Sequence, residues 1–367
     1  MKRSLYLGQF SKIKVFVHWT FLILIAYIVL VGLSSGQNAA QIGWHILFIL
    51  TIFLCVVLHE FGHALVGRRF GFRTKDIVLL PIGGVARFEK LPENPKQEFL
   101  VSIAGPAVNF VIATIIYFAA QLSIHSVLSL DMTSVNAANF VILLWVVNLS
   151  LGFFNLIPAF PMDGGRIFRS ILAMFQPREK ATKIAVAVGQ VLAVGFIVWG
   201  LYYNPFLIVI GAFIILAGSA ESSMVHSQIW LEGYTAKDIV MHDFATMSGD
   251  TTLGDAAKNI LNSQSTHFVV TDRGRIVGNI NRNQIIKAIT THEEGTTLFE
   301  IMEPSTDSIS SDTALKELLL NPVLKGGALI PVIEDGDILG VLNMENILEF
   351  VAIRESKSNK RLRKSTT

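Results

Sequence analysis

The chain has 367 residues, of which 51% are hydrophobic and 16% are charged, whereas a soluble protein of this length carries nearer ~25% charged residues. Residues 1–222 hold 16 Lys/Arg against 9 Asp/Glu, and residues 223–367 hold 14 against 19. The first part of the chain is therefore basic and the second part is acidic, and together they give the net charge of +2. The single cysteine excludes a disulfide framework, and the nearly neutral total argues against a nucleic-acid partner.

Four long stretches of the first part contain no charged side chain. A membrane-spanning helix needs only ~20 such residues, so a soluble enzyme is excluded for this half. Turn residues at 32–38 and 202–205 divide the first and the last stretch. The pattern predicts a polytopic α-helical membrane domain over 1–222. Its six expected transmembrane helices lie near 16–33, 42–66, 99–121, 138–157, 183–201 and 205–221.

Basic residues indicate the orientation of these helices, because Lys and Arg accumulate in cytoplasmic loops. They gather at the N-terminus, after the second predicted helix and after the fourth, whereas the other three loops contain neither Lys nor Arg. With six spans, all basic segments lie on one face. We therefore expect a multi-pass protein of the cytoplasmic membrane, embedded in the lipid bilayer, with both termini in the cytosol.

The second predicted helix ends in His59-Glu60-Phe61-Gly62-His63. Two histidines four residues apart share one helical face and can bind one metal ion, and Glu60 lies beside that ion as a base for a water molecule. Zinc lowers the pKa of such a water towards ~7 and polarises the carbonyl under attack. An ionisable cluster inside an apolar helix indicates function. The alternative is a pair of histidines satisfied by backbone carbonyls.

A tetrahedral catalytic site needs a third protein ligand. His45 lies too far back along the same helix, His125 belongs to the outer end of the third helix, and His18 is a weak candidate at the start of the first. Asp163 follows the fourth helix in a segment, 155–166, that is interrupted by Pro and Gly. The predicted topology brings it to the same side as the histidines. Asp163 is the best third ligand, and a helix N-cap is its alternative role.

Residues 59–63 and 155–166 together resemble the two motifs of the site-2 protease family of intramembrane zinc metalloproteases. The resemblance covers most of residues 1–222. It implies that His59, His63 and Asp163 bind one zinc ion and that Glu60 is the general base. It also implies that the substrate is a transmembrane segment of another protein.

Further positions carry weaker parts of the resemblance. Asn155 and Pro161 match positions thought to help hold the substrate, and Asn109 lies in a segment that looks like the family's third-helix motif. An interhelical hydrogen bond for each Asn and a helix break for Pro161 are the alternatives. Cys55 is spaced for metal contact, but we interpret it as a packing residue. Residues 77–88 suggest a hairpin beside the active site, which either pairs with an unwound substrate or is a re-entrant structural loop.

The second part of the chain matches itself at a constant offset of 62 residues. Aligned pairs include Ile239 with Ile301, Asp250 with Asp312, Thr251 with Thr313, Leu253 with Leu315, Gly274 with Gly336 and Gly278 with Gly340. The pattern resembles a soluble α+β tandem pair of cystathionine-beta-synthase (CBS) domains, at 235–292 and 297–352. A linker at 223–234 precedes the pair, and a basic tail at 353–367 is expected to be disordered.

CBS pairs often bind adenosine nucleotides, and the binders commonly carry Thr or Ser followed by Asp three residues later. Here these positions are Asn281 and Gln284 in the first copy, and Asn343 and Asn346 in the second. Amides can hydrogen-bond a ribose, but without the strength of a carboxylate. An adenosine nucleotide cofactor and a purely dimerising module that makes a homo-oligomer therefore remain open.

Together these patterns predict a zinc metalloendopeptidase that performs regulated intramembrane proteolysis, with the CBS pair regulating access or activity. A CBS-gated channel or transporter is a rival interpretation. It predicts internal repeats among the membrane helices, and the sequence shows none. An inactive scaffold of the same fold is a third interpretation, against which the intact set of ligands and base argues.

Overall fold

The computed structural model describes most of the chain, including the predicted metal site. The described residues are 4–81, 83–88, 92–121, 135–304, 308–319, 321, 324 and 329–365, with the backbone alone given for 85–88 and 358–365. His125 lies outside them. The chain divides into two compact units, 1–223 and 224–367.

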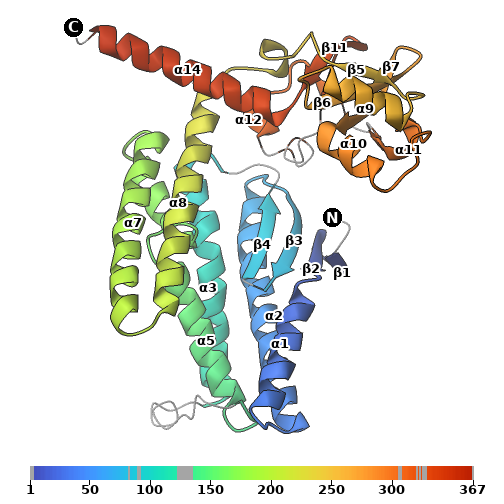
Figure 1. The fold of residues 1–367 in the computed structure, drawn as a ribbon. Helices are drawn as coiled ribbons and strands as arrows, with labels where there is room; N and C mark the ends of the chain where they lie inside the picture. Colours follow the sequence, from blue (N-terminus) through green and yellow to red (C-terminus); the bar gives the residue numbers. More distant parts are fainter. Residues whose placement is uncertain are drawn as a thin grey trace. The chain divides into compact units, whose positions relative to one another are not determined.

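The first unit is mainly helical (Figure 1). Its helices are α1 (Phe21–Ser34), α2 (Ala39–Arg69), α3 (Pro95–Ala119), α5 (Phe140–Asn155), α6 (Asp163–Ala173), α7 (Arg178–Tyr202) and α8 (Phe206–Trp230). Among the described helices, α2, α3, α7 and α8 are long and apolar enough to cross a membrane. The apolar helices α1 and α5 lie where spans were expected but have only 14 and 16 residues. The structure thus supports four of the six predicted spans.

A four-stranded sheet accompanies these helices, with strands in the order β1-β2-β3-β4. The strands are β1 (Ser4–Phe10), β2 (Ile13–His18), β3 (Thr74–Leu80) and β4 (Gly83–Phe88). Strands β2 and β3 are parallel, and the other neighbours are antiparallel. The predicted hairpin is confirmed, but the strand at 13–18 was not expected. The first helix begins at Phe21 rather than near 16, because alternate residues Ile13 and Val15 are buried, as in a strand with one packed face.

Glycines allow α2 and α3 to approach closely, as small residues do between membrane helices. A Cβ atom at Gly62 of α2 would lie 2.7 Å from the carbonyl oxygen of Ala104 in α3. A Cβ atom at Gly105 of α3 would lie 2.2 Å from a ring nitrogen of His63. The metal-site face of α2 therefore rests directly on the backbone of α3.

The chain between α5 and α6 folds back over the first turn of α6. A Cβ atom at Gly164 would lie 2.3 Å from the carbonyl oxygen of Ile157, and one at Gly165 would lie 2.7 Å from the carbonyl carbon of Ala159. Only residues without a side chain permit this approach. The fold-back places Asp163 as the first residue of α6, with Met162 at the N-cap position. The alternative role of Asp163 as an N-cap is therefore wrong.

The other half of α6 is held by a buried ionic cluster. Arg169 of α6 is 2% exposed and bonds to Glu98 of α3 and Glu221 of α8. Arg178 at the start of α7 lies 3.5 Å from the same Glu98 carboxylate. Four helices of the first unit thus meet at one charged junction.

The second unit contains two copies of one pattern, in which a short strand runs parallel to the first strand of an antiparallel hairpin. In the first copy these strands are β5 (Thr246–Ser248), β6 (His267–Asp272) and β7 (Arg275–Asn281), and in the second β9 (Ile309–Ser310), β10 (Ile330–Glu334) and β11 (Asp337–Leu342). The accompanying elements are η1 (Ala236–Asp238), α9 (Leu253–Leu261), α10 (Arg282–Ile289), α11 (Leu298–Ile301), β8 (Glu303–Pro304), α12 (Leu315–Leu318) and α14 (Met344–Ser365).

The two copies exchange their leading segments. Met241, before β5, pairs with Val341 of the second copy, and Glu303 of β8 pairs with Asn279 of the first. These two pairings are related by the offset of 62 residues seen in the sequence. Neither copy completes its pairing alone, so the tandem pair forms one packing unit.

Two segments at the ends of this unit continue neighbouring helices. Helix α8 continues to Trp230, so residues 223–230 of the expected linker are helical. Helix α14 continues to Ser365, so the tail from 353, expected to be disordered, is helical to that residue. The segment 344–365 contains neither Gly nor Pro, and Arg354 lies over the ring of Tyr234, 4.7 Å from its centroid. The favourable helix composition and this cation–π contact account for the order.

Candidate metal centre

Two histidines of α2 form one side of the candidate centre. His59 and His63 are each 7% exposed, and their ring centroids lie 4.8 Å apart. The Nδ1 atom of His63 lies 2.7 Å from the backbone carbonyl oxygen of Val101. The Nδ1 atom of His59 lies 2.5 Å from Oδ1 of Asn109. Helix α3 thus holds the outer nitrogen of each ring and leaves both Nε2 atoms facing the same point.

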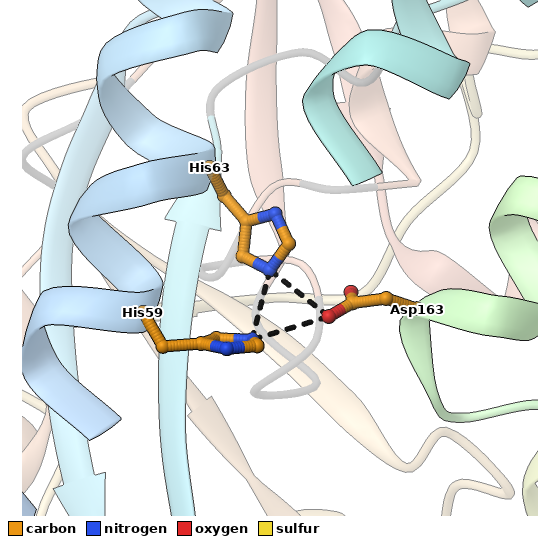
Figure 2. Close-up of side chains that lie close together, drawn as sticks. All are labelled: His59, His63 and Asp163. Atoms are coloured by element: carbon orange, nitrogen blue, oxygen red, sulfur yellow. Dashed lines mark hydrogen bonds and ion pairs between the residues drawn. The ribbon is translucent and has the colours of Figure 1, made fainter. Parts of the chain in front are cut away.

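Asp163 completes the cluster from α6 (Figure 2). Its Oδ2 atom lies 3.1 Å from Nε2 of His59 and 3.1 Å from Nε2 of His63, and the two Nε2 atoms are themselves 3.1 Å apart. Ligands about 2.0–2.1 Å from a tetrahedral zinc ion are separated by roughly 3.3 Å. The three atoms therefore form a nearly equilateral triangle of the size that one zinc ion requires.

The chemistry of these donors fits a cation. A backbone carbonyl only accepts hydrogen bonds, so the bond to Val101 requires the proton of His63 on Nδ1. In the neutral ring, Nε2 then offers a lone pair towards the carboxylate of Asp163. A Cβ atom at Gly105 would lie 2.2 Å from Nε2 of His63 and 2.6 Å from Nε2 of His59. The lack of a side chain at Gly105 keeps the space beside the donor atoms open.

The protonation state of Asp163 suits the same role. Burial raises the pKa of this carboxyl, but the charge of a protonated His63 and hydrogen bonds from protonated Nε2 atoms of both histidines outweigh burial and hold the pKa well below its usual range. A bound zinc ion would supply this positive charge in place of the histidine protons. Asp163 is therefore ionised, the form in which a carboxylate binds zinc.

Glu60 follows His59 on α2 and packs against strand β4. A Cβ atom at Gly84 would lie 2.9 Å from Cγ and 3.4 Å from Oε1 of Glu60. The backbone of β4 therefore limits where this carboxylate can lie. A base must be held close to the reacting atoms, and Gly84 is one contact that limits the position of Glu60.

The other candidate ligands lie in different surroundings. Nδ1 of His18 contacts the hydroxyl of Thr20 at 2.8 Å, and Nδ1 of His45 lies 2.8 Å from the carbonyl oxygen of Gln41 in its own helix. The buried Sγ of Cys55 lies 3.5 Å from Nδ2 of Asn148. Among the described residues, the group that could hold a metal ion consists of His59, His63 and Asp163.

The three residues expected near a substrate differ in position. Pro161 is exposed, and Asn155 is half-buried with its Nδ2 donating to the carbonyl of Leu151 at 3.0 Å. Asn109 is fully buried and bonds to His59 and Asn148. The alternative of an interhelical hydrogen bond is therefore the one observed for Asn109. Sequence reasoning missed Asn148, although an uncommon amide inside the uncharged stretch 132–162 was a usable signal.

In the second unit, the amides at the expected ribose positions cap helices. Asn281 and Gln284 exchange hydrogen bonds of 2.8 and 2.9 Å between side chain and backbone at the start of α10. Gln284 also donates to Glu303 at 2.7 Å. Asn343 and Asn346 form the same pair at the start of α14.

A cavity of about 460 Å³ opens between the two copies beside the second amide pair. It is lined by Asn343 and Asn346 and by the acidic residues Asp243, Glu345 and Glu349, together with polar and apolar residues of both copies. None of the described residues that line it is Lys or Arg.

Comparison with known proteins identifies the family. The family model for peptidase family M50 matches residues 47–198, and the CBS domain model matches residues 236–291. A zinc metalloprotease of Methanocaldococcus jannaschii is 34% identical over 358 residues, which cover 97% of this chain and 98% of that protein. This chain belongs to peptidase family M50.

Other known proteins are similar to this chain over shorter stretches. Stage IV sporulation protein FB of Bacillus subtilis is 28% identical over 62% of this chain and 73% of its own length. The solved structure of the site-2 protease from Methanocaldococcus jannaschii is 36% identical, covering 60% of this chain and 95% of that chain, with a TM-score of 0.43. The predictions of a site-2-type metallopeptidase and of a CBS module are confirmed at the level of the family.

Proposed function

We propose that this M50 peptidase is an intramembrane zinc endopeptidase that cleaves transmembrane or membrane-adjacent segments of other proteins. The observation that carries the proposal is the triangle of His59, His63 and Asp163, with 3.1 Å between each pair of donor atoms. Helix α2, which supplies both histidines, and helix α3, which holds their Nδ1 atoms, are each long and apolar enough to span a membrane.

The residues of the site divide the reaction between them. A zinc ion held by His59, His63 and Asp163 would acidify a water molecule and polarise the scissile carbonyl. Glu60 accepts the proton of the attacking water and returns it to the leaving amine. Because a helical peptide bond is shielded, the substrate must be extended when it is cleaved. We propose that the extended substrate segment pairs with β4, which is an edge strand beside Glu60.

Zinc analysis of the purified full-length protein tests the metal assignment. We expect one zinc ion per chain, lost in His59→Ala and Asp163→Asn. His45→Ala is a matched control on the same helix, because the hydrogen bond of its ring described above is made to Gln41 within α2, and it should retain zinc. A chelator should abolish cleavage of a reconstituted membrane substrate, and added zinc should restore it. Full zinc content in His59→Ala, or cleavage by the zinc-free protein, would contradict the proposal.

We propose a multi-pass location in the cytoplasmic membrane, with six spans and both termini cytosolic. Helices α1 and α5 reach only ~21 and ~24 Å at 1.5 Å per residue, against a hydrocarbon core of ~30 Å, so flanking residues must complete these two crossings. The distribution of Lys and Arg supports the orientation. Reporter fusions at Gly36 and Tyr203 should report the outside, and fusions at the two termini the cytosol.

We further propose that the CBS pair binds an adenosine-type ligand in the cavity beside Asn343 and regulates cleavage. The cavity favours this over a purely dimerising module. The carboxylates that line it disfavour phosphate groups, so we expect adenosine to bind at least as tightly as ATP. Equilibrium dialysis with both ligands tests this, and tight ATP binding without adenosine binding would contradict it. Whether the pair also forms a homo-oligomer stays a prediction, which sedimentation of the purified protein would test.

A further inference from the structure

A row of buried hydrogen bonds connects three helices behind the candidate metal centre. Nδ1 of His59 in α2 lies 2.5 Å from Oδ1 of Asn109 in α3, and Nδ2 of Asn109 donates to Oδ1 of Asn148 in α5 at 3.1 Å. Nδ2 of Asn148 donates to the backbone carbonyl of Leu144 at 2.9 Å. Both asparagines are fully buried. Asn148 does not reach the metal ligands itself, and the proposed reaction gives it no role.

The backbone carbonyl at the end of this row sets the direction of every bond in it. The oxygen of Leu144 can only accept, so Asn148 must turn its NH₂ group towards it. The carbonyl oxygen of Asn148 then faces Asn109, which must present its own NH₂ group. The carbonyl oxygen of Asn109 is left for His59, whose Nδ1 must therefore carry the proton.

A second contact opposes reversal of the Asn148 amide. The same Nδ2 atom lies 3.5 Å from the buried Sγ of Cys55, so both of its hydrogens have an acceptor. Turning the amide over would place its oxygen against the carbonyl of Leu144. That arrangement loses a hydrogen bond and leaves two buried oxygens in contact, which is costly away from water.

We infer that Asn148 is a positioning residue that holds His59 in the tautomer able to bind zinc. With its proton on Nδ1, a neutral imidazole presents the lone pair of Nε2 to the metal. The opposite tautomer places a proton where zinc would bind. The inference rests on the proposed zinc function and gives Asn109 the same role, as the link between Asn148 and the ring.

The second histidine provides an internal comparison. Nδ1 of His63 bonds directly to the backbone carbonyl of Val101 at 2.7 Å, so the tautomer of His63 needs no side chain to set it. Replacing Asn148 should therefore release His59 alone. A general loss of structure would affect both rings.

Zinc affinity of the full-length protein, measured by competition with a chelator, is the first test. In Asn148→Leu, which has a similar shape but no polar group, we expect zinc binding to weaken by about 10- to 100-fold. Thr182→Val is the matched control, because Thr182 is equally buried and also bonds to a carbonyl one turn back, that of Arg178, at 2.8 Å. This control should keep the affinity of the wild type. An affinity within twofold of wild type in Asn148→Leu would overturn the inference while leaving the zinc proposal intact.

Nitrogen NMR of protein labelled in histidine is the second test, and it needs no variant. In the zinc-free wild type, at a pH where the nitrogen shifts show both rings to be neutral, the two rings whose signals respond to added zinc should carry their protons on Nδ1. In Asn148→Leu, one of the two should change to the other tautomer. In Asn148→Asp, a carboxyl oxygen still accepts the hydrogen bond from Asn109, so this variant should restore the wild-type pattern. A proton on Nε2 of His59 in the wild type would overturn the inference even if Asn148→Leu failed to fold.

Discussion

At the scale of single residues, the candidate centre depends as much on glycines as on ligands. Gly105 lies against the Nε2 atoms of both histidines, and Gly84 lies against the carboxylate of Glu60. Neither glycine is required by an unusual backbone angle, because neither has a positive φ in the left-handed range. Glycine is needed at both positions because a side chain at 105 would displace the two histidine rings and one at 84 would displace Glu60.

Gly105→Ala should remove the metal without unfolding the protein. The added methyl group would lie 2.2 Å from Nε2 of His63, so this ring or α3 must move away from the triangle. Zinc analysis should show much less than one ion per chain. Gly43→Ala on α2 is the control, because no atom lies within 4 Å of a Cβ there, and it should retain zinc. Equal zinc contents in the two variants would contradict this role for Gly105.

Gly84→Ala should separate catalysis from metal binding. Its methyl group would meet Cγ of Glu60 at 2.9 Å and displace the base but not the three ligands. A shift of about 1 Å in a catalytic group can cost ~100-fold in rate. We therefore expect full zinc content with a cleavage rate reduced by about that factor. A rate equal to that of wild type would show that β4 does not position Glu60.

At the scale of elements, helix α6 connects the site to the rest of the first unit. It begins with Asp163 and is held six residues later by Arg169, whose partners Glu98 and Glu221 belong to α3 and α8. The ionic cluster therefore holds the helix that supplies the third ligand.

Arg169→Met should destabilise the first unit strongly. Removing one member of a buried ion pair leaves an uncompensated charge and costs about 3–5 kcal/mol. Lys183→Met breaks an exposed pair with Glu179 on α7 and should cost under ~1 kcal/mol. The free energy of unfolding, measured by titration with SDS in mixed micelles, compares the two variants. Similar small losses would mean that the cluster does not hold α6 in place.

Sequence alone predicted the elements with long-range periodic signals and missed those set by tertiary contacts. The uncharged stretches located the apolar helices, and the repeat indicated the strand pattern that occurs twice in the second unit. The strand at 13–18 was missed because its apolar residues run directly into the first helix. The tail after 353 was misjudged because its basic composition hides the contact of Arg354 with Tyr234.

The metal triangle was predictable because the spacing of His59 and His63 places both on one helical face. The surroundings of the triangle were not. The contacts of Gly84 and Gly105 and the hydrogen bonds of Asn148 depend on how α3, α5 and β4 meet α2. The packing of these elements against α2 produces no periodic pattern in the sequence.

At the scale of the whole molecule, helix α8 is the covalent connection between the peptidase unit and the CBS pair, and the unit boundary falls within it. Regulation requires that a CBS ligand change the cleavage rate. We expect adenosine to alter cleavage by the full-length protein but not by a chain ending at Trp230, which keeps α8 whole. An adenosine response that survives this truncation would contradict regulation through the CBS pair.

The acidic lining of the CBS cavity leads to a separate prediction. Replacing Glu345 and Glu349 by Gln removes two negative charges from its lining. Since surface charge pairs contribute up to ~1 kcal/mol each, ATP should bind a few-fold more tightly, while uncharged adenosine is unaffected. Equilibrium dialysis of both ligands with both proteins measures this. An equal change for the two ligands would mean that charge does not set the preference.

The most direct test of the central claim is cleavage of co-expressed single-pass membrane proteins by wild type and Glu60→Gln, with zinc measured in both. The substitution preserves the size of the side chain but removes the base. We predict that the wild type cleaves a substrate of the panel and that Glu60→Gln retains zinc but does not cleave. Equal cleavage by the two proteins, or a folded wild type that contains no zinc, would contradict the account.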